Sequence, residues 1–211
     1  HHMKFRKVPL KQRFLFKQPN SKEEYFLNSL HLSDLYLNTF IEKLKDEGLY
    51  DSSIIVITGD HSYPAGEHGY YDNQTSYYQE FFKTPLLIIW KDGLSPKRVT
   101  NKSYSHIDVL PTLLDILDRE IEVNLAGKSI LKNEDSTAYL VQPYNGVYLG
   151  VVQYPYKYVW ERRTDREYLF NIKNDKNEKK PIENDKIIEL MRKQRDYIIY
   201  NDEFLNLHFR L

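Results

Sequence analysis

The sequence predicts an α/β fold that carries a small antiparallel β appendage and a C-terminal helix. Residues 37–44 contain apolar side chains at helical spacing. Two unbroken apolar runs follow, at residues 54–57 and 86–90, and such runs are typical of strands buried by helices in parallel sheets. After about residue 135, short alternating or aromatic runs separated by turn residues indicate antiparallel hairpins.

Three helices are expected from their boundary signals. Ser21 and Glu24 have the spacing of a capping box, in which each side chain satisfies the other's free backbone N–H, and Gly48 suits the position just after the helix. Asp108 is expected to cap a second helix, with Pro111 in its first turn. Apolar residues mark a last helix over 187–199, and the hairpin strands are expected at 138–141, 147–152, 157–160 and 168–172.

Composition excludes several classes of site. The 211 residues contain 30 Lys and Arg against 30 Asp and Glu, so net charge gives no argument for nucleic acid or an anionic membrane surface. The absence of cysteine excludes disulfides, zinc–thiolate sites and a cysteine nucleophile within the chain. No apolar run approaches the roughly 20 residues of a membrane span.

The segment 58–69 (Thr-Gly-Asp-His-Ser-Tyr-Pro-Ala-Gly-Glu-His-Gly) contains the candidate site. It follows directly on the first apolar run, and ligands of open α/β sheets bind beyond the carboxyl ends of strands. Asp60 and His61 offer a carboxylate oxygen and an imidazole nitrogen side by side, which are good ligands for a divalent cation. Glu67 and His68 form a second acid–His pair in the same loop.

Each of these residues also has a structural interpretation. Asp60 and His61 could form a strand-end turn, and His68 could serve the loop alone. His31 and His106 are interpreted as helix and helix-start residues. The aromatic residues of 144–160 fit hairpin packing better than a sugar platform, because strands favour aromatic side chains.

Several segments, taken in order along the chain, resemble the sulfatase family of the alkaline-phosphatase superfamily, including its lipoteichoic-acid-synthase-like transferases. Residues 44–69 resemble the family's helix, strand and Asp-His-Gly segment, and residues 105–114 resemble its Asp-x-x-Pro-Thr helix. Further similar segments are 78–86, 127–131 and 157–175. The resemblance spans roughly residues 25–178 and implies the C-terminal part of an alkaline-phosphatase-like sheet with flanking helices.

The resemblance also implies a mechanism and roles for named residues. A metal-activated nucleophile, formylglycine in sulfatases or Thr or Ser in phosphotransferases, attacks a sulfate or phosphate ester. Asp60 and His61 occupy the positions of the family's C-terminal metal ligands, and His68 lies where loop residues face the substrate. The metal could be calcium, manganese, magnesium or zinc.

Three departures from the family pattern qualify this expectation. The nucleophile, the opposing acidic ligands and a substrate-binding His belong before residue 21, and residues 4–20 offer none of them. Gln74 stands where sulfatases carry a sulfate-binding Lys, which favours phosphoester over sulfate chemistry. Ser62 replaces the usual Gly after Asp-His.

The expected organisation is a tag remnant at residues 1–3, the C-terminal portion of the sulfatase-like domain at 4–135, and a hairpin subdomain with a C-terminal helix at 136–211. The chain is expected to supply half of a metal site, to need the N-terminal half of the same domain as its partner, and to be inactive alone. A whole protein of this kind is expected outside the cytoplasm or anchored to a membrane. The alternative is a non-catalytic sulfatase-like module with a binding or structural role.

Overall fold

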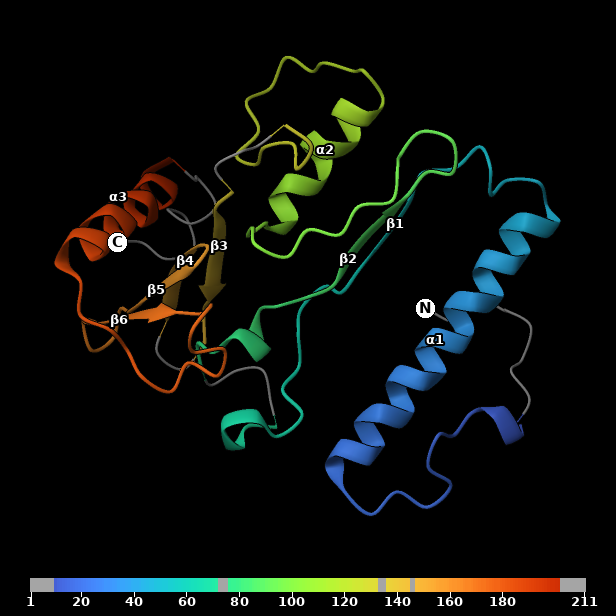
Figure 1. Cartoon of the computed structure of the whole chain (residues 1–211), viewed down its shortest axis with the longest axis horizontal. Helices are drawn as coiled ribbons and strands as arrows, with labels where there is room; N and C mark the ends of the chain where they lie inside the picture. Colours follow the sequence, from blue (N-terminus) through green and yellow to red (C-terminus); the bar gives the residue numbers. More distant parts are fainter. Residues whose placement is uncertain (1–9, 72–75, 133–135, 145–146, 202–211) are drawn as a thin grey trace. The chain divides into compact units, whose positions relative to one another are not determined.

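The computed structural model describes residues 10–71, 76–132, 136–144 and 147–201 (Figure 1). It consists of two compact units, each of which is described by itself. The first unit comprises residues 1–73 and 80–96, and the second comprises residues 74–79 and 97–211.

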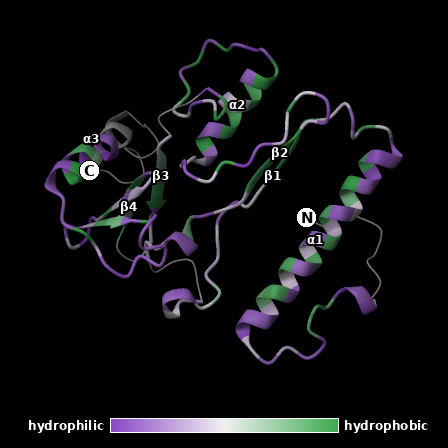
Figure 2. Cartoon of the chain, in the orientation of Figure 1, coloured by the Kyte–Doolittle hydropathy of each residue, from purple (hydrophilic) through white to green (hydrophobic). Residues whose placement is uncertain are grey.

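Helix α1 (Lys22–Asp46) dominates the first unit and confirms the first predicted helix. Hydrophilic and hydrophobic residues alternate along its length, as expected of an amphipathic helix (Figure 2). Ser21 is the N-cap and its hydroxyl accepts from Glu24 N, whereas the Glu24 carboxylate accepts from Asn20 N rather than from Ser21 N. Gly48, at φ +67°, follows the C-cap residue Glu47 as predicted.

Side chains of α1 fasten the segment that precedes it. This segment begins with a short 3₁₀ turn, η1 (Leu10–Gln12). The buried Asn28 amide accepts from Phe16 N at 2.8 Å and donates to Phe16 O at 2.9 Å, as a neighbouring strand would. His31 Nε2 lies 2.8 Å from Gln12 O, so this histidine has the structural role expected of it.

Strands β1 (Ile55–Thr58) and β2 (Leu86–Ile89) form the sheet of the first unit. They confirm the two predicted strands, but they pair antiparallel, with Ile55 opposite Ile89. The expected burial on both faces is wrong for β2, because Leu86 and Leu87 are 38% and 51% exposed. In the described part of the chain this sheet has two strands. An apolar run in the sequence therefore indicated a strand, but it did not determine the direction of pairing or which side chains are buried.

In the second unit, helix α2 (Val109–Ile116) follows the 3₁₀ turn η4 (His106–Asp108). Asp108 stands at the N-cap position of α2, as predicted, but its side chain makes no capping bond there; Ser105 caps η4 instead, in a capping box with Asp108. The buried Asp108 carboxylate accepts from Ser105 N at 2.8 Å and from Lys128 N at 2.9 Å. The buried Thr112 hydroxyl accepts from Ile130 N. The Asp-x-x-Pro-Thr segment therefore anchors the 128–130 loop to the helix.

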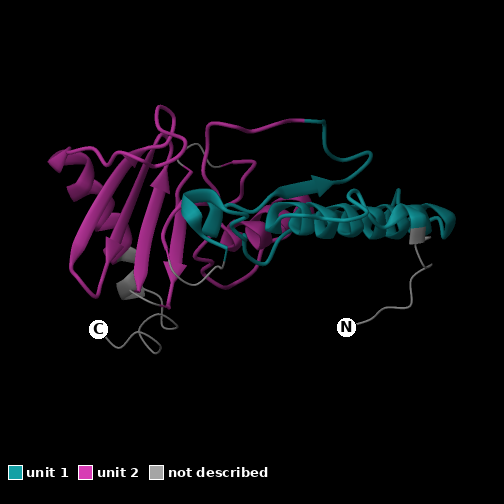
Figure 3. Ribbon diagram, turned by 90° about the horizontal axis from the view of Figure 1, so that it is seen from below, with its two compact units in different colours: residues 1–73, 80–96 teal, residues 74–79, 97–211 magenta. Residues whose placement is uncertain are grey.

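Four antiparallel strands, joined in chain order, form the sheet of the second unit (Figure 3). They are β3 (Ala138–Gln142), β4 (Tyr148–Gln153), β5 (Tyr156–Glu161) and β6 (Arg166–Asn171). These strands confirm the predicted hairpins. Their register places Val151, Tyr158 and Leu169 side by side on one face of the sheet.

Helix α3 (Asp185–Asn201), the predicted last helix, completes the core on that face. Met191 packs with Val151, Tyr158 and Leu169, and all four are at most 1% exposed. Burial of each aliphatic side chain of this kind contributes about 1.5–3 kcal/mol. Among the helices that the structure describes, none is long and apolar enough to cross a bilayer.

Candidate metal and ester site

The candidate site begins where β1 ends. Ile55 anchors the strand in the first unit, and the chain turns at Gly59 before Asp60. A Cβ at Gly59 would lie 3.1 Å from His61 O and 3.4 Å from Thr84 Cγ2, so a larger residue would push against both neighbours. A small residue here lets the backbone fold back tightly and present the next two side chains.

Asp60 and His61 are ordered by hydrogen bonds within their own turn. Asp60 Oδ1 accepts from His61 N at 2.9 Å, and His61 Nδ1 lies 2.8 Å from Ser62 O. Because a carbonyl oxygen only accepts, Nδ1 carries the proton in this contact and the neutral ring has its lone pair on Nε2. Nε2 lies 3.8 Å from Asp60 Oδ2, and the two side chains are 53% and 90% exposed.

This arrangement fits part of a metal site. Divalent cations bind nitrogen and oxygen ligands at about 2.0–2.6 Å, so two donor atoms 3.8 Å apart can reach one ion. The Nδ1–H bond to Ser62 O is the kind of outer contact that orients a ligand histidine. Within the described residues, no third His, Asp or Glu joins the pair in a metal-binding group.

The rest of the loop closes on itself through backbone and side-chain bonds. Gly66 has φ +122°, a conformation that a residue with a Cβ rarely adopts. Glu67, in the 3₁₀ turn η2 (Glu67–Gly69), accepts from Ala65 N at 2.6 Å. Glu67 therefore stabilises the loop.

His68 contacts a carboxylate that the sequence did not single out. Its Nδ1 lies 2.6 Å from Glu80 Oε1, and both side chains are mostly buried, at 19% and 14% exposed. Glu80 belongs to the short turn η3 (Gln79–Phe81). The separation of 12 residues explains why local reasoning missed it, although Glu80 stands in a segment that resembles the family. Gln74 lies outside the described residues.

The chain belongs to the sulfatase family. The family model "Sulfatase" matches residues 2–119, and the model "N-sulphoglucosamine sulphohydrolase, C-terminal" matches residues 66–200. Each match covers more than half of the chain, and the two overlap on the loop that carries His68. The resemblance to the alkaline-phosphatase-like superfamily is thereby confirmed.

Curated relatives include sulfatases and a lipoteichoic acid synthase. The chain is 28% identical to the N-acetylglucosamine-6-O-sulfatase of Bacteroides thetaiotaomicron, over 63% of this chain and 24% of that protein. It is 32% identical to arylsulfatase K of Bos taurus, over 47% and 18%. It is 31% identical to lipoteichoic acid synthase 1 of Bacillus subtilis, over 56% and 19%.

Solved structures share the fold. A putative sulfatase from Bacteroides thetaiotaomicron superposes with a TM-score of 0.70 at 20% identity, over 90% of this chain and 45% of that one. A protein solved in complex with its substrate D-glucosamine-2-N,6-O-disulfate gives 0.65 at 21% identity, over 85% and 41%. The chain thus spans less than half the length of these structures and about a quarter or less of the curated relatives.

Proposed function

We propose that this chain supplies Asp60 and His61 to the metal site of a sulfatase-family enzyme that cleaves or transfers sulfate or phosphate ester groups. The observation that carries the proposal is the exposed carboxylate–imidazole pair at the end of β1, with Oδ2 and Nε2 3.8 Å apart. The family match and the presence of both sulfatases and a lipoteichoic acid synthase among the relatives support the reaction class.

The residues of this chain would hold and orient the reacting centre. A bound divalent cation would supply charge stabilisation at the ester and at the attacking group. Asp60 contributes negative charge and one oxygen ligand, and the bond from His61 Nδ1–H to Ser62 O holds the ring with Nε2 directed outward. His68, oriented by Glu80, and Gln74 are proposed to contact the substrate.

The nucleophile and the remaining acidic ligands are proposed to come from the N-terminal half of the same domain. The length of the relatives, of which this chain matches only part, supports this division. The whole enzyme is proposed to act outside the cytoplasm or at a membrane, as the sulfatase and lipoteichoic acid synthase relatives suggest.

Metal affinity tests the ligand assignment. In a protein that carries this chain within an intact sulfatase domain, Asp60→Ala and His61→Ala should each weaken Mn²⁺ or Ca²⁺ binding by about 100-fold or more, since even outer contacts of metal ligands contribute 10–100-fold. Titration calorimetry gives the affinity. Asp34→Ala removes an exposed carboxylate from α1 and should leave the affinity unchanged. Unchanged affinity in both site variants would refute the assignment.

A further inference from the structure

Residues 74–79 belong to the second unit, although the residues on both sides of them, up to 73 and from 80 to 96, belong to the first. The described part of this segment, residues 76–79, is called the strap. It leads from the loop that carries His68 to Glu80, whose carboxylate lies 2.6 Å from His68 Nδ1. We propose that Lys157 and Glu178 are positioning residues, which hold the strap so that Glu80 keeps the His68 ring in its orientation.

Two polar bonds and a ring stack hold the strap against the sheet of the second unit. Lys157 Nζ donates to Tyr77 O at 2.6 Å, and Glu178 Oε2 accepts from Gln79 N at 2.6 Å. The Tyr77 ring stacks on Tyr168, with 4.9 Å between the ring centres. Because both polar bonds are made to backbone atoms, they fix the path of the strap itself.

Stability alone does not account for a buried ion pair at this place. Lys157 and Glu178 are 0% and 2% exposed, and the desolvation of two charges offsets much of their attraction, so a well-packed apolar pair often stabilises a protein as well or better. Glu178 also has a backbone φ of +49°, which is unfavourable for a residue with a Cβ. An apolar pair would offer no partner to Tyr77 O or Gln79 N. What the charged pair adds is therefore the placement of the strap.

Glu80 lies between two anchored neighbours in the chain. On one side is Gln79, whose N–H is bonded to Glu178. On the other side is Phe81, which is 4% exposed and whose ring meets Tyr70 edge-on at 5.4 Å. Since each residue has only two soft backbone dihedrals, a residue joined to two fixed neighbours has little freedom to move its side chain. The position of the Glu80 carboxylate thus depends on the strap.

The direction of the His68 ring depends in turn on Glu80. His68 has a φ of +51°, in the left-handed region that residues with a Cβ rarely adopt. Its Nδ1 lies 2.6 Å from Glu80 Oε1, and because a carboxylate accepts, Nδ1 carries the proton in this contact. The inference rests on the proposed contact of His68 with the substrate, but the placement of the ring can be measured separately.

NMR of the 211-residue chain measures the His68 ring without catalysis. Comparison with His68→Asn assigns the Nδ1–H signal, which should exchange slowly with water because the His68 and Glu80 side chains are mostly buried. Lys157→Met combined with Glu178→Leu should keep the unit folded but release the strap, and should speed this exchange about tenfold or more. Tyr77→Ala removes a ring from the strap, leaves the ion pair in place, and should act in the same direction.

Glu167→Gln is the matched control for lost stability. It removes the partner of Arg192 in the same unit and leaves the contacts of the strap intact, so the exchange of the His68 proton should stay within about twofold. Unchanged exchange in a folded Lys157→Met/Glu178→Leu variant overturns the proposal, and so does an equal increase in Glu167→Gln. If the double variant does not fold, unchanged exchange in Tyr77→Ala overturns it.

Kinetics of an intact sulfatase domain that includes this chain test whether the pair acts through His68. Lys157→Met/Glu178→Leu should lower kcat/KM for 4-nitrophenyl sulfate or bis(4-nitrophenyl) phosphate by about tenfold, and by less than about twofold when His68 is already Asn. Equal losses in the two backgrounds overturn the positioning role. If His68→Asn alone leaves kcat/KM unchanged, the proposed substrate contact fails, whereas faster proton exchange in the double variant still supports the placement of the ring.

Discussion

Lys157 and Glu178 form an ion pair that is almost completely buried in the second unit, at 0% and 2% exposed. Lys157 Nζ lies 2.5 Å from Glu178 Oε1 and donates to Tyr77 O at 2.6 Å, while Glu178 Oε2 accepts from Gln79 N at 2.6 Å. Each charge therefore has a partner of opposite sign and a backbone bond. The pair fastens the 77–79 segment to the sheet, on the face opposite α3.

Removing one charge of this pair should destabilise the second unit strongly. Lys157→Met leaves Glu178 buried without its cation, and breaking a buried pair from one side costs about 3–5 kcal/mol. Urea unfolding followed by circular dichroism measures the loss. Lys157→Met combined with Glu178→Leu should recover much of the lost stability, because an apolar pair replaces two desolvated charges. A double variant as unstable as the single one would contradict this account.

At the scale of single residues, sequence reasoning reaches only patterns formed by a few neighbouring residues, and the ligand role of Asp60 and His61 stays a prediction. Asp60 and His61 are neighbours at the end of a strand, so their pattern could be seen in a few residues. The His68–Glu80 and Lys157–Glu178 contacts join residues 12 and 21 positions apart, and only the folded chain brings them together. Single acidic or basic residues in a sequence carry no sign of such partners.

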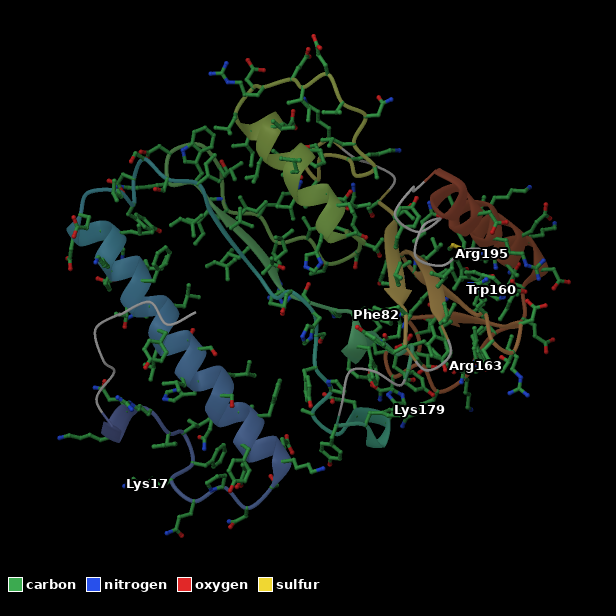
Figure 4. The ribbon with its side chains drawn as sticks, turned by 180° about the vertical axis from the view of Figure 1, so that it is seen from behind. Lys17, Phe82, Trp160, Arg163, Lys179 and Arg195 are labelled. Atoms are coloured by element: carbon green, nitrogen blue, oxygen red, sulfur yellow. The ribbon has the colours of Figure 1, made fainter. Side chains whose placement is uncertain are left out.

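Among the elements, α3 is fastened to the sheet by charged side chains as well as by its apolar face. Arg192 Nε donates to Glu167 Oε1 at 2.7 Å, and Arg195 donates to Tyr158 Oη at 2.8 Å. Arg195 also lies over the Trp160 ring, 4.3 Å from its centre, and Figure 4 shows the two side chains together. Hydrogen bonds from Arg192 lower the pKa of Glu167.

The lowered pKa gives a pH dependence to the attachment of α3. Since the folded state holds Glu167 ionised below its ordinary pKa of 4.5, its contribution is complete above that value and is lost as pH falls through the folded pKa. Glu167→Gln should lower the free energy of unfolding by about 1–2 kcal/mol at pH 7, a modest cost because Arg192 is 48% exposed and its charge is screened in part. The cost should be smaller at pH 3, because protonation of Glu167 weakens its ion pair with Arg192. Denaturant unfolding at both pH values measures this difference.

Glu189→Gln is the matched control for that prediction. Glu189 pairs with Lys193 on the same helix, but both side chains are mostly exposed, at 65% and 70%. Exposed pairs contribute little, so this variant should change the unfolding free energy much less than Glu167→Gln. An equal effect of the two variants, or an effect of Glu167→Gln that persists at pH 3, would exclude the proposed role of the Glu167 carboxylate.

Elements were predicted well where a pattern repeats along the chain. The helical spacing and caps of α1 and the alternating runs of β3 to β6 are local signals, and the observed bounds agree closely with the prediction. The direction and cover of β2 depend on what pairs with it and packs on it, so its apolar residues could not reveal the exposure of Leu87. Helix α2 begins directly after Asp108 as predicted, whereas the side chain that makes a capping bond is Ser105, at the start of η4.

For the whole molecule, the exposed apolar side chains of β2 and the partial coverage of the related structures both support contact with further parts of a domain. Leu86 and Leu87 of β2 are exposed, and the chain spans under half the length of the solved sulfatase-like structures. An apolar strand of this kind suits contact with further parts of a domain. We therefore expect the N-terminal half of the domain to extend or cover the β1–β2 sheet and to bring the opposing ligands to Asp60 and His61.

The chain on its own should consequently lack ester hydrolase or transferase activity. The resemblance places the nucleophile and the acidic ligands before residue 21, and in the described residues the Asp60–His61 pair has no third His, Asp or Glu beside it. Purified chain with Mn²⁺, Ca²⁺ or Mg²⁺ should turn over 4-nitrophenyl sulfate and bis(4-nitrophenyl) phosphate no faster than metal in buffer. An intact sulfatase domain that includes this chain should turn over at least one of them, and Asp60→Ala should reduce that rate by about 100-fold or more. Turnover by the isolated chain at the rate of the intact domain, and its loss in Asp60→Ala, would show that these 211 residues already contain a complete site.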